Sequence, residues 1–238
     1  MKRIKFFILI LFTATAIQMP GQNHYAGACG LIGLSNASGD NTLAYPRLSY
    51  GLSYDYSIDR HLHIGVDFLY YRIGYRSVLY SIDAEGNVTE LNNLAKFQFE
   101  YYTFPIKLGL HYGKKYYGYT NAGATISLIH DATSYTPKID ENGNEYSRRP
   151  NNLLSYVPGA TPGIMLEQGF GIQFKERIRV FTTLSFYRDL GKLYLQYYYL
   201  TEENVRLYAL NLKIGVNYAL SKKAVLKDPD ENKDSVND

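Results

Sequence analysis

The chain has 238 residues, with 25 basic and 22 acidic side chains and a formal net charge of +3. Loss of the three basic residues near its start would leave a formal charge of zero, so nothing in the charge suggests nucleic acid as a partner. The single cysteine, Cys29, excludes an internal disulfide. Because Cys29 lies well past the apolar N-terminal run, we expect a small residue of the first strand rather than a lipidation site.

Residues 1–22 are predicted to be a secretory signal peptide. Basic residues precede an apolar run over 6–17; the small residues Ala14 and Ala16 offer one cleavage site, and Gly21–Gln22 offers a later one. The run is shorter than the roughly 20 residues that a membrane-spanning helix needs. We therefore expect an exported protein whose mature chain begins near residue 23.

Eight segments of the mature chain alternate apolar and polar residues with a period of two, two of them (24–35 and 116–130) more loosely, and this period is typical of strands. The clearest is 207–220, where Leu212 and Ile214 are predicted to face lipid and Lys213 the interior. It is long enough to cross a bilayer, which takes about 9–11 tilted residues. We predict an all-β fold, an eight-stranded antiparallel up-and-down transmembrane β-barrel. The predicted strands are 24–35, 48–57, 62–70, 102–112, 116–130, 164–174, 178–186 and 207–220.

The connections alternate between short and long, as in outer-membrane barrels with periplasmic turns and extracellular loops. Short polar turns are predicted at 59–60, 113–115 and 175–177, and long polar stretches at 36–46, 76–96, 131–157 and 189–205. Two long stretches contain IDAEGNV (82–88) and IDENGNE (139–145), which predict hairpin tips on strands that extend beyond the membrane. The barrel domain is thus expected over 23–220. Residues 221–238, with four lysines and five acids, are predicted to be a disordered periplasmic tail.

Residues 97–113, FQFEYYTFPIKLGLHYG, are followed by a basic turn and the glycine-containing segment YTNAGATISL. This pattern resembles the PorT-type outer-membrane β-barrel family, OmpX/OmpA-like eight-stranded barrels that are common in Bacteroidota. The resemblance extends to about residue 220. It implies an outer-membrane location and, for some members, a part in protein secretion; it implies no catalytic residues. The tail departs from barrels that end on an aromatic residue of the last strand.

The same alternation predicts a set of charges inside the barrel. An eight-stranded barrel has room only for side chains, and desolvated charges need partners. We expect Asp67 to pair with Lys107, with Glu167 or Lys213 as the alternative partner. The predicted lumen charges are Asp55, Asp67, Lys107, Glu167, Arg179 and Lys213.

These charges favour a plugged lumen over an ion path. We predict a non-enzymatic barrel with a structural, surface-interaction or secretion-accessory role, the alternative being a narrow pore for small solutes. Its expected partners are outer-membrane lipid and other envelope or secretion proteins. No cofactor is expected.

Catalytic and metal sites are poorly supported. His130 and Asp131, near Ser127, are the best catalytic candidates, but no motif supports them. His61 and His63 share a face at a predicted turn without a third ligand, so a metal is not expected.

Tyrosine is abundant, with 25 residues and no tryptophan. Clusters at 70–75, 101–102, 116–119 and 197–199 lie near strand ends, which favours girdles at the headgroup level or strand extension. Extracellular contact is the alternative for one group only, namely Tyr194, Tyr197, Tyr198 and Tyr199.

Overall fold

The structure, a computed structural model, describes residues 23–39, 42–59, 61–82, 88–139, 145–174, 177–191, 193–194 and 204–220. The predicted signal peptide and the predicted tail lie outside these ranges. The tips of the two predicted hairpins, 83–87 and 140–144, also lie outside them.

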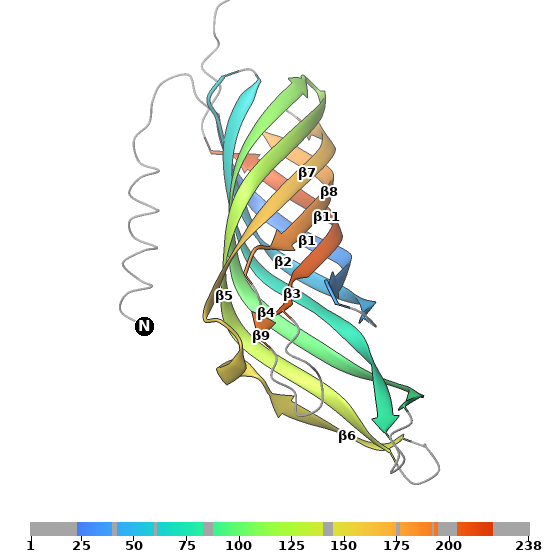
Figure 1. Cartoon of the computed structure of the whole chain (residues 1–238). Coiled ribbons are helices and arrows are strands. Elements are labelled where there is room, and N and C mark those ends of the chain that lie inside the picture. The colour runs from blue at the N-terminus through green and yellow to red at the C-terminus, as the bar shows by residue number, and fades with distance from the viewer. Residues whose placement is uncertain are drawn as a thin grey trace, which may run out of the picture.

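The described residues form β-strands and one short 3-10 helix, η1. The elements are β1 (Asn23–Ala37), β2 (Thr42–Ser57), β3 (Leu62–Ile82), β4 (Val88–Gly113), β5 (Tyr116–Ile139), β6 (Glu145–Asn152), η1 (Leu154–Tyr156), β7 (Ala160–Phe174), β8 (Ile178–Asp189), β9 (Leu193–Tyr194), β10 (Asn204–Val205) and β11 (Leu207–Ala219). Antiparallel pairing runs around the ring β1–β2–β3–β4–β5–β7–β8–β11 and returns to β1. The sheet therefore closes into an eight-stranded barrel, and the predicted fold class is confirmed (Figure 1).

The two ends of the barrel differ. At one end, here named the turn end, short turns join β2 to β3 and β4 to β5. At the other, the loop end, β3, β4 and β5 continue beyond the neighbouring strands, and β6 pairs with the extension of β5 (Figure 1). The strands beside both predicted hairpin tips are therefore present, as β3 with β4 and as β5 with β6.

The tight turns have local causes. Gly113, which ends β4, has a φ of 97°, a left-handed conformation that glycine adopts without strain. In the β2–β3 turn, Asp59 Oδ1 accepts hydrogen bonds from the backbone N–H groups of His61 (2.6 Å) and Leu62 (2.7 Å). These bonds hold the pKa of the Asp59 carboxyl below its usual value. Their stabilisation of the turn is thus present at neutral pH and is lost as the pH falls through that lowered pKa.

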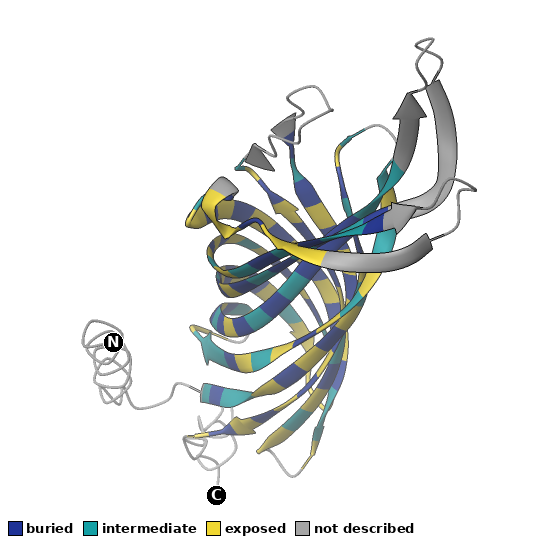
Figure 2. Ribbon diagram, turned by 90° about the horizontal axis from the view of Figure 1, so that it is seen from below, coloured by how far each residue is buried: buried dark blue, intermediate teal, exposed yellow. Residues whose placement is uncertain are grey.

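Burial alternates along most of the length of the barrel strands, as Figure 2 shows. On β11 the pattern is strictly alternating: Lys213 is 2% exposed, whereas its neighbours Leu212 and Ile214 are 45% and 54% exposed. The predicted faces of this strand are confirmed. Cys29 also points inward, as a buried free thiol on β1.

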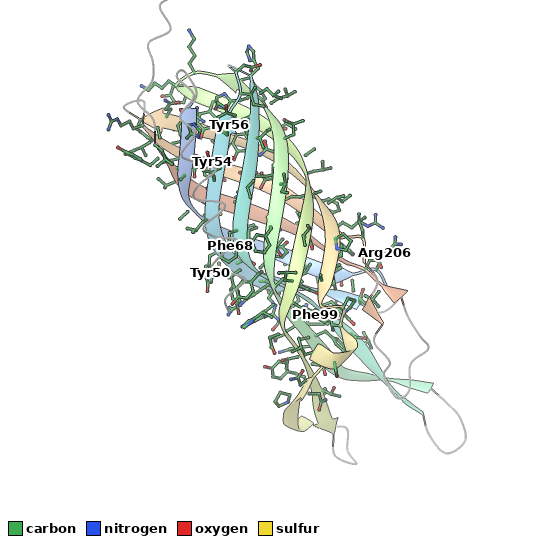
Figure 3. The ribbon with its side chains drawn as sticks, turned by 90° about the vertical axis from the view of Figure 1, so that its left-hand side faces the viewer. Tyr50, Tyr54, Tyr56, Phe68, Phe99 and Arg206 are labelled. Atoms are coloured by element: carbon green, nitrogen blue, oxygen red, sulfur yellow. The ribbon has the colours of Figure 1, made fainter. Side chains whose placement is uncertain are left out.

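The outside of the barrel is an apolar belt of leucine, isoleucine, valine and phenylalanine. On this outer face Tyr54 and Tyr56 lie near the turn end, and Tyr50 and Phe68 lie farther toward the loop end (Figure 3). No helix in the described part of the chain is both long and apolar enough to span a membrane.

The prediction that the tyrosine clusters form girdles is wrong for five of the eight described members. Tyr102 and Tyr116 are on the outer face, but Tyr71, Tyr101 and Tyr117 are buried inside the barrel. Adjacent residues of a strand point to opposite faces, so a run of consecutive tyrosines is divided between lipid and lumen.

Candidate functional site in the barrel lumen

Four charged side chains meet in the middle of the lumen, one each from β3, β4, β7 and β11. Lys107 Nζ lies 2.8 and 2.9 Å from the two carboxylate oxygens of Asp67 and 3.5 Å from Glu167 Oε2. Lys213 Nζ lies 2.6 Å from Asp67 Oδ2 and 3.1 Å from Glu167 Oε1. Each lysine therefore contacts both acids. We name these four residues the charge network; its formal charge is zero and no member is more than 3% exposed.

The pairing register explains how residues of non-adjacent strands meet. All four are at inward positions of the alternation, and Lys107 lies directly opposite Gly65 of β3. A Cβ atom at Gly65 would lie 3.0 Å from Lys107 Cε and 2.5 Å from Asp55 Oδ1. The missing side chain thus leaves the space through which the Lys107 side chain reaches the centre of the barrel.

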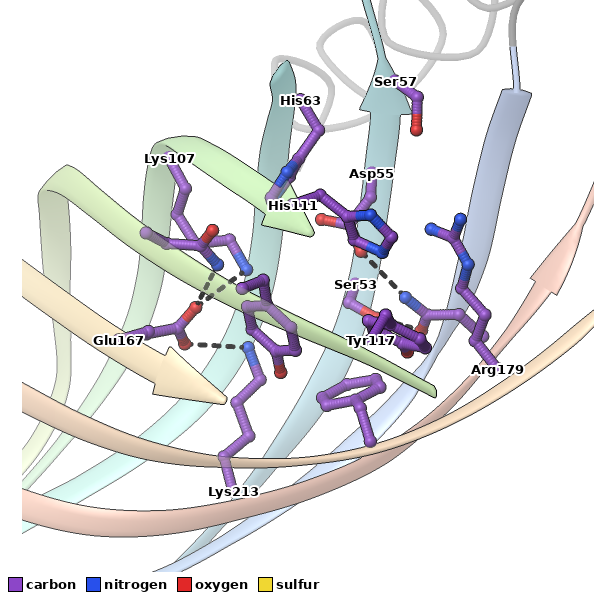
Figure 4. Close-up of a pocket in the computed structure, with 14 residues that line it drawn as sticks. Ser53, Asp55, Ser57, His63, Lys107, His111, Tyr117, Glu167, Arg179 and Lys213 are labelled. Carbon is purple, nitrogen blue, oxygen red and sulfur yellow. Dashed lines mark hydrogen bonds and ion pairs between the residues drawn. The ribbon is translucent and has the colours of Figure 1, made fainter. Parts of the chain in front are cut away.

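A cavity of about 40 Å³ lies between the charge network and the turn end (Figure 4). It has room for a few water molecules. Its lining includes Asp55, Arg179, His63 and His111 as well as three members of the network. Asp55 Oδ2 accepts a hydrogen bond from Asn217 Nδ2 (2.8 Å). The Arg179 guanidinium stacks on the Tyr25 ring at 3.5 Å.

A layer of hydroxyl groups lies on the loop side of the charge network. Ser127 Oγ is 2.9 Å from Thr103 Oγ1 and 3.0 Å from the Tyr187 hydroxyl. The Tyr187 hydroxyl also donates a hydrogen bond to Asp189 Oδ1. The void beside this layer is only about 10 Å³, at the lower limit for a single water molecule.

Apolar side chains fill the loop end of the lumen. The rings of Tyr75 and Phe97 stack with centroids 4.7 Å apart, and Ile73 and Phe99 are fully buried beside them. Val157, which follows η1, belongs to the same buried cluster. The lumen thus changes along its axis from a polar cavity through charges and hydroxyls to an apolar cap.

The structure brings together four of the six predicted lumen charges. Asp55 and Arg179 also point inward but lie in the turn-end cavity, where other side chains hold them. Of the four tyrosines named for extracellular contact, Tyr197, Tyr198 and Tyr199 lie outside the described residues. Tyr194 ends β9, and its side chain is likewise not described.

The best catalytic candidates do not come together. Ser127 is fully buried in the lumen, whereas the His130 ring packs on the outer face against Tyr70 and Tyr102. Asp131 accepts a hydrogen bond from Thr133. Among the described residues, no three histidine, cysteine or acidic side chains are placed to hold a metal ion.

Asp189 is a buried lumen acid that the sequence reading missed. Residues from 189 onward are predicted to be loop, but β8 continues to Asp189, which is 1% exposed. A signal was present: Asp189 continues the odd-numbered series of inward positions that contains Arg179. Extending the period-two pattern by three residues would have placed it in the lumen.

These features define the class of protein. A closed barrel satisfies all of its strand hydrogen bonds, and an apolar exterior around a polar, charged interior is the arrangement of transmembrane β-barrels. The chain is an integral β-barrel protein of the bacterial outer membrane.

No protein-family model and no curated protein matches the sequence. Among solved structures, the chain is similar to Neisserial surface protein A, with 15% identity, a TM-score of 0.43 and coverage of 81% of this chain and 96% of that one. It is also similar to the outer membrane protein OprG from Pseudomonas aeruginosa (10% identity, TM-score 0.44, coverage 85% and 97%). A third similar structure is the outer membrane protease OmpT from Escherichia coli (9% identity, TM-score 0.42, coverage 86% and 99%). Similarity at this level carries no function from these proteins to this chain.

Proposed function

We propose that this protein is a non-enzymatic barrel with a plugged lumen that acts through its extracellular surface, in surface interaction or as an accessory to secretion. The charge network is the observation that supports a plugged lumen. Two lysines and two acids from four strands lie across the barrel axis with their charges balanced and their polar atoms in contact. The hydroxyl layer and the apolar cap add two further closed layers on the loop side.

The plug can be tested in planar bilayers. Because water and ions would have to displace the charge network and the apolar cap, we expect the purified protein to give no steady open-channel current. The matched comparison is the variant Lys107→Met/Asp67→Leu, which keeps the neutral pair Lys213–Glu167 in the lumen. Steady currents from the unmodified protein would refute the plug and favour a pore.

A narrow pore for small solutes is the second candidate, and one observation favours it. The turn-end cavity reaches the charge network, since Lys107, Glu167 and Lys213 are part of its lining. A solute entering from that side would therefore meet the network as the first barrier. Rearrangement of the network, the hydroxyl layer and the cap would be needed for passage.

The surface role is supported by the long strands of the loop end. The β3–β4 pairing continues to the pair Ile82–Val88, well beyond the last β2–β3 pair, Thr42–Ser77. An extended sheet that rises above the membrane is suited to contact with other envelope proteins. The resemblance of 97–113 to PorT-type barrels makes secretion the first process to examine.

Complementation of a deletion strain would separate the two candidates. One variant replaces residues 79–93 by a two-residue Asn-Gly turn between the paired residues Val78 and Leu94. The other is Lys107→Met/Asp67→Leu, which alters only the lumen. For a surface role, the shortened hairpin should fail to restore the profile of secreted proteins while the lumen variant restores it. The opposite result would support the pore.

A further inference from the structure

A cluster of two arginines, two tyrosines and one acid lies on the outer face of the barrel, on β2, β3 and β4. We name it the interface patch: Tyr45, Arg47, Tyr70, Arg72 and Glu100. The Arg47 guanidinium carbon lies 4.0 Å from the centre of the Tyr45 ring, and that of Arg72 lies 5.1 Å from the centre of the Tyr70 ring. Stacking on an aromatic ring fixes the plane of each guanidinium and with it the directions of its N–H groups.

The patch lies where the apolar belt ends on the loop side. On β3 the outward positions change from Phe68 through Tyr70 to Arg72. On β4 they change from Ile106 through Tyr102 to Glu100. An apolar surface that gives way to tyrosine and then to charge marks the level of the lipid headgroups. With the loop end outside the cell, this level belongs to the outer leaflet.

The two arginines differ in their partners. Arg72 Nε forms an ion pair with Glu100 Oε1 at 3.2 Å, although it has no hydrogen-bond partner among the described residues, and Glu100 accepts a hydrogen bond from the Tyr70 hydroxyl. Arg47 Nε and Nη2 are shielded from solvent, yet have no hydrogen-bond partner among the described residues. Arg72 and Glu100 are electrostatic neighbours of Arg47. Since Glu100 balances one of the two cations, the five residues of the patch have a formal charge of +1, and two of the three nitrogen atoms of the Arg47 guanidinium have no hydrogen-bond partner among the described residues.

Shielded donors of a charged group are costly unless an acceptor meets them. We propose that the interface patch binds the phosphate group of an outer-leaflet lipid headgroup, with Arg47 as the primary ligand and Arg72 as the second. A phosphate presents several acceptor oxygens and pairs with guanidinium groups in a bidentate manner. The lipid's acyl chains would lie along the neighbouring apolar belt, beside Phe68 and Ile106. The proposal requires the outer-membrane location but is independent of whether the lumen is plugged.

The test uses the full-length mature protein in phosphatidylcholine nanodiscs that contain a small fraction of diphosphoryl lipid A. Bound lipid is measured by native mass spectrometry as a function of lipid A content. We expect Arg47→Gln/Arg72→Gln to weaken lipid A binding at least about tenfold, because two charge-assisted contacts are lost. Arg47→Gln alone leaves the Arg72–Glu100 ion pair in place and should still weaken binding several-fold. Heat-modifiable migration in gels shows whether each variant is folded.

The charge-matched control is Arg188→Gln/Arg206→Gln, which removes two other arginines near the loop end, outside the patch. We expect this control to change lipid A binding by less than about threefold. The unmodified protein should bind dephosphorylated lipid A no more tightly than the variant Arg47→Gln/Arg72→Gln binds lipid A. The proposal would be overturned if Arg47→Gln/Arg72→Gln and the unmodified protein bound lipid A with equal affinity. It would also be overturned if the unmodified protein bound dephosphorylated lipid A as well as it binds lipid A. Displacement of lipid A by an equal concentration of inorganic phosphate would instead indicate a site for a free anion.

Discussion

Replacement of Asp67 by leucine is expected to lower the free energy of unfolding in bilayers by about 3–5 kcal/mol. Asp67 contacts both lysines of the charge network and is completely buried. Its loss would leave Glu167 as the only acid of the charge network opposite Lys107 and Lys213, so that the network would carry one excess buried positive charge. Urea unfolding in lipid vesicles, followed by tyrosine fluorescence or gel migration, measures the change.

A double-mutant cycle gives this prediction its control. Lys107→Met alone should also destabilise the barrel, but Lys107→Met combined with Asp67→Leu should recover much of the loss, because a neutral pair remains. We expect a coupling energy of about 0.5–3 kcal/mol between Asp67 and Lys107. Asp55→Asn is a useful comparison and should cost less, since Asp55 is bound by the neutral Asn217. A coupling energy of zero would mean that water enters the lumen and screens these charges, which would favour the pore.

Replacement of Ile214 by arginine is expected to lower the free energy of unfolding by about 2–4 kcal/mol. Ile214 lies on the lipid face of β11, 54% exposed, next to the inward-facing Lys213. An arginine side chain there would have to enter hydrocarbon or bend out of it. The same unfolding measurement in vesicles of known thickness tests the effect.

Tyr208→Arg is the matched control, because Tyr208 lies on the same strand and the same face as Ile214 but at its loop end. The cost of a basic residue falls to about 0–1 kcal/mol near the membrane interface. Equal losses for Ile214→Arg and Tyr208→Arg would show that the outer face of β11 does not follow the depth profile of a bilayer.

The structure separates the best catalytic candidates of the sequence, Ser127 and His130. Ser127 has hydroxyl partners on both sides, from Thr103 and Tyr187, and no histidine reaches it among the described residues. His130 lies on the other face of the same strand, because it is an odd number of positions from Ser127 and adjacent residues of a strand point to opposite faces. A serine hydrolase needs a base within hydrogen-bond reach of its nucleophile. This pair of residues does not provide one.

The sequence by itself determined the fold class and the direction of most side chains. Period two is a property of the extended chain, so the placement of Lys213 inside and Ile214 outside follows from the alternation on β11 without knowledge of any other strand. The short turns and long connections then indicated an up-and-down barrel. The extension of the strands at the loop end was readable from the hairpin motifs near 82–88 and 139–145.

Only the tertiary structure decided which inward residues meet. Partners across the lumen depend on strand stagger and barrel closure, which bring β11 beside β1 and place Lys213 between Asp67 and Glu167. A pattern read along one strand carries no information on this stagger. A bulge likewise changes which residues become neighbours. The β2–β3 pairing register shifts between Ala44 and Tyr50, and this shift accompanies the placement of Arg47 near Arg72 on the outer face. Local alternation fixes the face of a residue, whereas its neighbours on other strands are fixed by how the whole sheet closes.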